Sequence, residues 1–158
     1  MNQAIFDQHP SAILSTPNGV QVFKICTTKF AYPDADNVYD ADWHWNYLSF
    51  TLPAFKAEIE DVILDGQMLQ ICITELEALT SFRSKKAEIA PNEPYFELEF
   101  TLKRKKRVKV NGYVQYPAGY GATLDFEFIT DLTSIVTFLS GLKEILEHFP
   151  PAETRGFS

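Results

Sequence analysis

Alternation of apolar and polar residues at every second position is the feature that most limits what this chain can fold into. Phe96, Leu98, Phe100 and Leu102 alternate with Glu97, Glu99 and Thr101, and residues 122–128 repeat the pattern. Val108 and Val110 resume it between these two stretches, and residues 46–64 carry it as one long strand or as two strands interrupted at Pro53. Because successive side chains of a strand point to opposite faces, the pattern predicts an antiparallel meander with one buried face.

Two other segments have the three-and-four spacing of an amphipathic helix. The first follows Asp65-Gly66 and places Leu69, Cys72, Ile73, Leu76 and Leu79 on one stripe. The second begins near Asp131, ends at Pro150-Pro151, and carries Leu132, Ile135, Val136, Leu139, Leu142, Leu146 and Phe149 on its stripe. Each stripe needs an apolar cover. The predicted fold is therefore α+β, a single domain with a mainly antiparallel sheet and two helices packed on one face.

The length of 158 residues fits one domain, residues 1–158, with loose ends at 1–18 and 152–158. The N-terminal residues lack the basic and apolar regions of a signal peptide, and no apolar run reaches the ~20 residues of a membrane span. We therefore expect a cytoplasmic protein with no membrane partner. Cys26 and Cys72 lie in apolar patterns and are expected to be reduced and buried.

The net charge of −7 is unevenly distributed along the chain. Residues 31–66 hold eight acidic side chains and a single basic one, Lys56, whereas residues 103–107 are five consecutive cations. That basic run falls between two predicted strands, where a solvated hairpin tip is the simplest interpretation and a nucleic-acid patch the alternative. An acidic surface repels nucleic acid and attracts basic partners, so we expect a basic protein partner and no direct nucleic-acid binding.

The acidic stretch offers candidate sites for metal binding and for acid–base catalysis. Counted from Asp34, a calcium-binding EF-hand loop needs Gly at position six and Glu at position twelve, but Tyr39 and Trp45 occupy these positions. His44, close to Asp40 and Asp42, could serve in acid–base chemistry, but no nucleophile accompanies it. The histidines and cysteines lack metal-ligand spacing. We therefore expect no catalytic residue, no metal and no cofactor.

Four stretches, taken in order, resemble one known family. They are Asp40-Ala41-Asp42-Trp43, Glu93-Pro94-Tyr95-Phe96-Glu97-Leu98, Leu124-Asp125-Phe126-Glu127-Phe128 and the closing His148-Phe149-Pro150-Pro151. Together they resemble the WapI family of bacterial immunity proteins, small cytosolic proteins that bind and silence a partner toxin of a polymorphic toxin system. The resemblance covers roughly residues 40–151. It implies an inhibitor without catalytic turnover, whose partner is a toxin domain.

The sequence therefore predicts an immunity protein that binds and neutralises a toxin. Its predicted partner-binding residues are Asp34, Asp36, Asp40, Asp42, Trp43 and Trp45, because carboxylates steer a basic partner and indoles anchor it. Two alternatives remain open at this stage. One is an enzyme or small-ligand-binding domain that uses the aromatic region Trp43–Tyr47 as a pocket wall. The other is an adaptor module.

Overall fold

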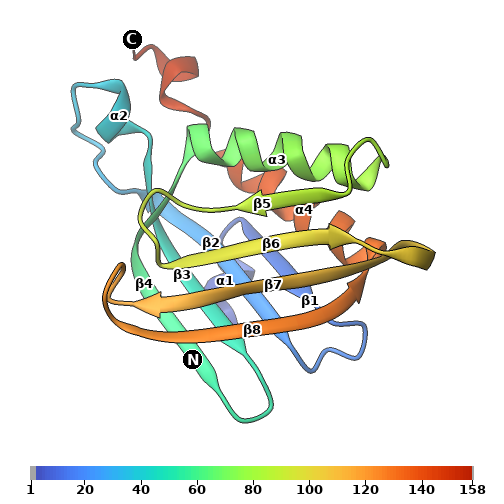
Figure 1. Cartoon of the computed structure of the whole chain (residues 1–158). Helices are drawn as coiled ribbons and strands as arrows, with labels where there is room; N and C mark the ends of the chain where they lie inside the picture. Colours follow the sequence, from blue (N-terminus) through green and yellow to red (C-terminus); the bar gives the residue numbers. More distant parts are fainter. Residues whose placement is uncertain (1–2, 158) are drawn as a thin grey trace.

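The chain folds as two successive four-stranded antiparallel meanders, each followed by one long helix (Figure 1). The structure is a computed structural model and describes residues 3–157. The first half comprises β1 (Ser11–Ser15), β2 (Val22–Phe30), β3 (Trp43–Thr51), β4 (Lys56–Asp65) and α3 (Gly66–Thr80). The second half comprises β5 (Lys86–Ile89), β6 (Phe96–Leu102), β7 (Arg107–Tyr116), β8 (Ala122–Asp131) and α4 (Leu132–His148). Four short helices lie in the connections or near the ends: α1 (Gln3–Gln8), α2 (Val38–Ala41), η1 (Arg104–Lys106) and η2 (Ala152–Arg155).

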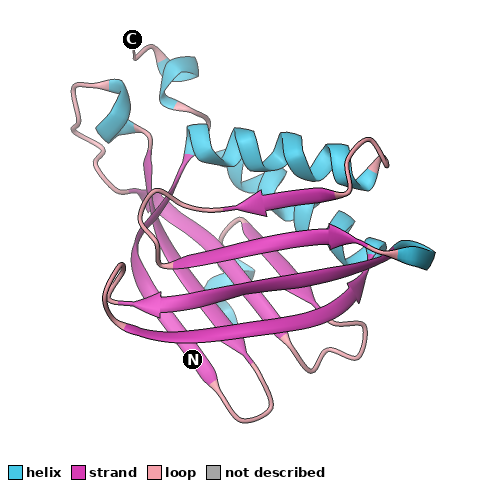
Figure 2. Ribbon diagram, viewed as in Figure 1, coloured by secondary structure: helices cyan, strands magenta, loops and turns pink. Residues whose placement is uncertain are grey.

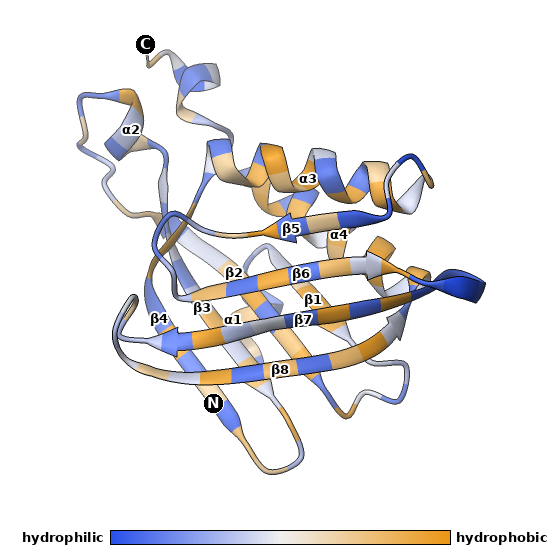
Figure 3. Cartoon of the chain, viewed as in Figure 1, coloured by the Kyte–Doolittle hydropathy of each residue, from blue (hydrophilic) through white to orange (hydrophobic). Residues whose placement is uncertain are grey.

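The two sheets face each other, and their strands cross in the view of Figure 2. Phenylalanines from the two inner faces meet between them: the ring centroids of Phe23 and Phe96 are 5.1 Å apart, and those of Phe50 and Phe126 are 4.1 Å apart. Aromatic pairs at these separations add to the stability that burial provides. The alternation along β6 and β8 is visible in Figure 3 as orange and blue bands. The apolar sides of the strands therefore meet between the sheets, and the buried faces of α3 and α4 complete the core.

Each long helix begins directly at the end of a strand, and an aspartate caps it. The Asp65 carboxylate accepts a hydrogen bond from the Met68 amide, and the Asp131 carboxylate accepts one from the Ser134 amide, both at 2.8 Å. An aspartate at this position satisfies an amide that has no partner within the helix and favours the positive end of the helix dipole. The two halves thus share one plan, four strands and a capped helix.

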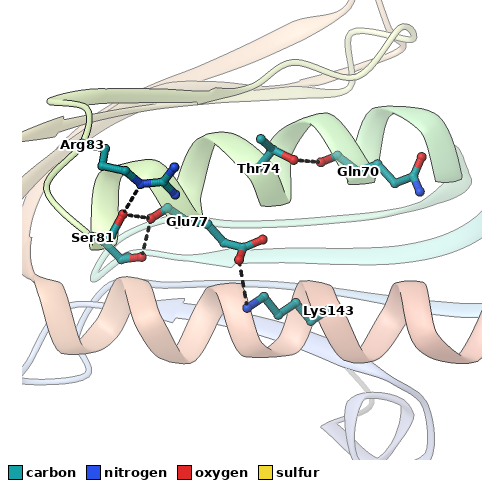
Figure 4. A network of polar contacts seen from close by, with 7 residues as sticks. Gln70, Thr74, Glu77, Ser81, Arg83 and Lys143 are labelled. Atoms are coloured by element: carbon teal, nitrogen blue, oxygen red, sulfur yellow. Dashed lines mark hydrogen bonds and ion pairs between the residues drawn. The ribbon is translucent and has the colours of Figure 1, made fainter.

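The helix pair lies along one side of the sandwich, with α3 beside β5 and α4 beside β1. A Cβ atom on Gly141 of α4 would overlap the Ser11 carbonyl oxygen and the Ala12 Cα, so only glycine allows the helix to approach the strand this closely. Between the helices, Lys143 Nζ lies 3.6 Å from a Glu77 carboxylate oxygen (Figure 4). Within α3 the Thr74 hydroxyl donates to the Gln70 carbonyl at 3.0 Å. Just beyond its end, Arg83 Nε donates to the Ser81 hydroxyl at 2.9 Å, and that hydroxyl donates to the Glu77 carbonyl at 2.7 Å (Figure 4).

The structure confirms the α+β class and several finer predictions. Residues 46–64 form two strands separated by a turn at Pro53, β7 runs through Asn111-Gly112 to Tyr116, and the basic run forms the hairpin tip η1. All five predicted stripe residues of α3 are buried. On α4, however, Val136 is 49% exposed, whereas Phe138 and Ile145, which the stripe omitted, are fully buried. The second side of α4 is covered because it packs against both α3 and β1.

Two predictions about the arrangement differ from the structure. The strands form two sheets instead of one, because β1 and β5 were not recognised, and the helix pair covers their edges instead of one sheet face. The segment 1–18, predicted to be loose, contributes β1, in which Ala12 and Leu14 are fully buried. The segment 152–158, also predicted to be loose, begins with η2, in which Ala152 is buried. Residues 1, 2 and 158 lie outside the described residues.

Both cysteines are buried and unpaired, as the sequence predicts. Burial raises the pKa of the Cys26 thiol to about 11 and that of the Cys72 thiol to about 12, so both are protonated at neutral pH. Among residues 3–157, no helix has both the length and the apolar composition that a membrane span requires.

Candidate partner-binding groove

A hollow of about 490 Å³ opens where three segments far apart in the sequence meet. We name it the acidic groove. Its lining comprises Tyr32, Ala35, Asp40, Trp43, Asp61, Val62, Glu93 and Tyr95. One wall is the connection between β2 and β3, which contains α2; another is β4; the third is the loop that leads into β6. The groove thus brings together two of the stretches that carry the family resemblance, Asp40–Trp43 and Glu93–Tyr95.

Hydrogen bonds within the first wall fix its shape. The Ala31 amide donates to the Trp43 carbonyl at 2.9 Å and closes the connection at its base. The Asn37 side chain accepts from the Asp40 amide at 2.9 Å and caps α2. A cap of this kind holds the first turn of a helix too short to persist alone. Asp40 and Trp43 are therefore presented from an ordered turn.

A buried carboxylate anchors this wall to the body of the protein. Asp42 is 8% exposed, and its two oxygens accept from the Gln67 amide at 2.8 Å and from the Ala152 amide at 2.9 Å. A Cβ atom on Gly66 would lie 2.6 Å from one of these oxygens, so a glycine begins α3 here. Asp42 thereby joins the start of β3, the first turn of α3 and the C-terminal η2.

The C-terminal segment secures the same wall from behind. Arg155 donates from Nη2 to the Ala41 carbonyl at 2.6 Å and from Nε to the Pro150 carbonyl at 2.9 Å. Its guanidinium group lies over the Phe30 ring, 3.8 Å from the centroid. A guanidinium stacked on an aromatic face combines cation–π attraction with directed hydrogen bonds. Residues 152–155 therefore act as a latch on the connection that contains α2.

The opposite walls are held from the two sheets. The Tyr95 carbonyl accepts from the Gln115 amide of β7 at 2.8 Å, which fixes the loop before β6. Asn92 donates to the buried Asp65 carboxylate at 3.0 Å, which ties the same loop to the start of α3. Burial, and after it the neighbouring Asp61 carboxylate, raises the pKa of the Tyr95 hydroxyl to about 12. Tyr95 is therefore a neutral hydrogen-bond donor in the groove at physiological pH.

The charge of the groove is uncompensated within residues 3–157. Asp40, Asp61 and Glu93 contribute three carboxylates to the lining, and none of them belongs to an ion pair of the described part of the chain. Tyr32, Trp43 and Tyr95 add aromatic surface to the lining. Such a surface suits a cationic partner, since carboxylates attract the charge and aromatic faces bind it without a further ion.

His44 lies beneath the groove wall and is fully buried on the inner side of β3. The Asn46 side chain donates to the Thr27 hydroxyl at 3.0 Å, and that hydroxyl lies 2.9 Å from His44 Nδ1. The ring packs against Phe30 and Phe149, with centroids 5.7 and 5.6 Å away. Because the imidazole is not exposed to solvent, a substrate cannot reach it. Its role is therefore structural, and the acid–base interpretation has no support.

Burial lowers the pKa of His44 to about 4. In the unfolded chain the group titrates near its ordinary value of 6.5. Below that value the unfolded chain binds the proton first, so we expect the free energy of unfolding to fall by about 3 kcal/mol between pH 6.5 and pH 4. Urea unfolding of the wild type and of His44→Phe at several pH values measures the difference. A difference that does not change with pH would contradict the buried neutral imidazole.

The six predicted partner-binding residues occupy different environments. Asp40 and Trp43 line the groove. Asp34 and Asp36 are exposed on either side of Ala35 in the same wall. Asp42 is buried and bound to backbone amides, and Trp45 lies farther along β3, where its indole donates to Glu60 at 2.9 Å. The structure thus brings Asp34, Asp36, Asp40 and Trp43 to one place and separates Asp42 and Trp45 from it.

The sequence prediction missed Tyr32, Asp61, Glu93 and Tyr95 as groove residues. Asp61 was counted in the acidic stretch, and Glu93 and Tyr95 were part of the resemblance, but nothing in the linear order places them opposite Asp40. The stretch around Glu93 that resembles the family was the signal available in the sequence. A turn that contains a proline before a strand does not need an acidic residue for its structure, so the charge of Glu93 could have marked it as a groove residue.

Two other charged surfaces lie away from the groove. The outer face of the second sheet carries Glu88, Glu97 and Glu99, whose carboxylate oxygens lie within 4.8 Å of one another. Burial and these neighbours raise the pKa of Glu97. The basic tip at η1 projects at the far end of the same sheet (Figure 3). These surfaces are the alternatives against which the groove has to be tested.

Comparison with known families identifies the relatives of this chain. The model of the Immunity protein WapI-like family matches residues 13–150, which include every residue of the groove lining. The chain belongs to the WapI-like immunity protein family. Within this WapI-like protein the latch residues 152–155 lie beyond the matched range. No protein of curated function matches the sequence.

Two solved structures match the chain over most of its length. The crystal structures of Trypanosoma bruciei MRP1/MRP2 match at 11% identity with a TM-score of 0.49, covering 94% of the WapI-like chain and 95% of the other. A guideRNA-binding protein complex bound to a gRNA matches at 11% identity with a TM-score of 0.48, covering 93% and 91%.

Proposed function

We propose that this protein is a cytoplasmic immunity protein that binds a cognate bacterial toxin domain and neutralises it without catalysis. The observation that carries the proposal is the acidic groove. There, two family-like stretches, Tyr32 and β4 together contribute three aromatic rings and three carboxylates that form no ion pair within residues 3–157. An inhibitor needs a rigid complementary surface and no reaction centre. The hydrogen bonds of Asp42, Asn37 and Arg155 supply that rigidity.

The toxin surface that meets the groove is basic. Asp34, Asp36 and Asp40 lie on or beside the rim and raise the rate of encounter with a positively charged domain. Trp43 supplies the apolar anchor, since Trp is enriched among the residues that dominate binding energies. Asp42 contributes to toxin binding indirectly, because its hydrogen bonds hold the groove wall in its shape. Trp45, on the outer face of β3, extends the contact if the toxin overlaps that sheet.

The test takes candidate toxin domains from the genes that neighbour this one and measures binding to, and protection from, such a domain. We expect the purified full chain to form a stable complex with that domain and to restore growth of cells that express it. The triple variant with Asp34→Asn, Asp36→Asn and Asp40→Asn should associate at least ~10-fold more slowly at low salt, with unchanged thermal stability. Absence of a complex and of protection for the wild type would refute the proposed function.

A further inference from the structure

The groove has the features of a pocket for one side chain. Its volume of about 490 Å³ falls within the range typical of ligand pockets. Residues that dominate protein interfaces are anchors seated in pockets of this kind, surrounded by weaker contacts. Its lining is fixed before a partner arrives, because Asn37, Asp42 and Arg155 hold the α2 wall. Binding there therefore requires little ordering.

The chemistry of the lining selects a cation of a particular shape. Its carboxylates come from three separate segments, so one ligand that satisfies them has to direct donors in several directions. Guanidinium carries five donors in a rigid plane and stacks on aromatic faces, whereas ammonium is a compact point charge. Tyr32, Trp43 and Tyr95 add aromatic rings to the same lining as the carboxylates. The lining therefore matches an arginine better than a lysine.

The chain itself uses this mode of binding a few residues away. Arg155 lies over the Phe30 ring at 3.8 Å while it donates to the Ala41 and Pro150 carbonyls. The groove combines aromatic rings with hydrogen-bond acceptors in the same way, with carboxylates in place of carbonyls. Charged acceptors make the stronger hydrogen bonds.

We infer that the acidic groove recognises an arginine side chain of the toxin, which inserts between Trp43 and Tyr95 and donates to Asp40, Asp61 and Glu93. This inference rests on the proposed function for the identity of the partner. The preference for an arginine side chain depends only on the residues that line the groove.

The test uses N-acetyl-arginine amide as the probe, titrated into the isotopically labelled full chain and followed by NMR. We expect saturable shifts of the Trp43 indole resonance with roughly millimolar affinity, as for a small ligand. N-acetyl-citrulline amide, which keeps the shape and lacks the charge, should bind at least ~10-fold more weakly. N-acetyl-lysine amide should fall between the two. The Trp45 indole serves as an internal reference outside the groove.

Matched pairs of variants distinguish binding in the groove from non-specific attraction by the negative charge of the protein. The pair Asp61→Asn with Glu93→Gln should weaken arginine amide binding at least ~10-fold. The pair Asp125→Asn with Glu127→Gln removes the same charge from the outer face of the second sheet and should leave binding unchanged. Thermal melts confirm that both variants fold. Equal weakening by both pairs would overturn the inference in favour of non-specific attraction.

The outcomes distinguish this inference from the proposed function. Binding of the toxin domain with no arginine amide binding would overturn the groove assignment and leave the immunity function intact. Arginine amide binding without any toxin complex would support the groove chemistry and count against the proposed function. Equal affinity for the arginine, lysine and citrulline amides would overturn the specificity for guanidinium.

Discussion

Replacing Asp42 by alanine is expected to lower the free energy of unfolding by about 3 to 6 kcal/mol. The Asp42 carboxylate accepts from the Gln67 amide at 2.8 Å and the Ala152 amide at 2.9 Å, and it is 8% exposed. Hydrogen bonds to a charged acceptor stabilise a fold by about 1.5 to 3 kcal/mol each, and the variant loses two. In the variant, the Gln67 amide in the first turn of α3 and the Ala152 amide in η2 both lose the carboxylate that they share as a hydrogen-bond acceptor.

The matched control is Asp40→Ala, an exposed aspartate two residues earlier in α2. Surface substitutions of this kind change stability by about 0.5 kcal/mol or less. Urea unfolding at neutral pH compares the two variants with the wild type. Asp42→Asn, which keeps one acceptor oxygen, should fall between them. Equal midpoints for Asp42→Ala and Asp40→Ala would show that the buried carboxylate does not anchor the α2 wall.

Replacing Phe138 by alanine should cost about 3 to 5 kcal/mol of stability. Phe138 of α4 is fully buried and touches both sheets, with ring centroids 6.2 Å from Phe23 of β2 and 6.2 Å from Phe100 of β6. Truncation removes this ring and leaves a cavity where three elements meet, and close-packed interiors collapse only partly around such a space. We expect the loss to appear as a lower denaturant midpoint.

Val136→Ala is the control on the same helix, because Val136 is 49% exposed although the sequence pattern placed it on the apolar stripe. Its truncation should change stability by less than about 1 kcal/mol. Circular dichroism melts in urea report both variants. If Val136→Ala were the more damaging of the two, the orientation of α4 around its axis would be incorrect.

The comparison of these two residues shows where sequence periodicity reaches its limit. The pattern correctly placed a helix that begins near Asp131 and ends before Pro150-Pro151. It assigned one apolar stripe, which suits a helix packed on a single surface. Helix α4 instead touches β1 on one side and α3 on another, so a wider arc is buried. Contacts made by a neighbouring element are not encoded in the local pattern.

The groove shows the same limit for function. The acidic, aromatic character of residues 31–45 was evident in the sequence, and Asp40 and Trp43 do line the hollow. Asp42 has the same residue type and nearly the same position in sequence, but it faces the interior and accepts two amides. Strand and turn geometry at the start of β3 directs these side chains to opposite sides. Composition alone could not separate a surface carboxylate from a structural one.

The sequence by itself determined the α+β class, most of the long strands, both long helices and the family, because these depend on local periodicity and the order of short motifs. Only the tertiary structure decided that eight strands divide into two facing sheets, each followed by its own helix. Only the tertiary structure placed Asp61, Glu93 and Tyr95 opposite Asp40. These facts depend on how distant segments pack against each other, and packing is set by the shared core and not by any one segment.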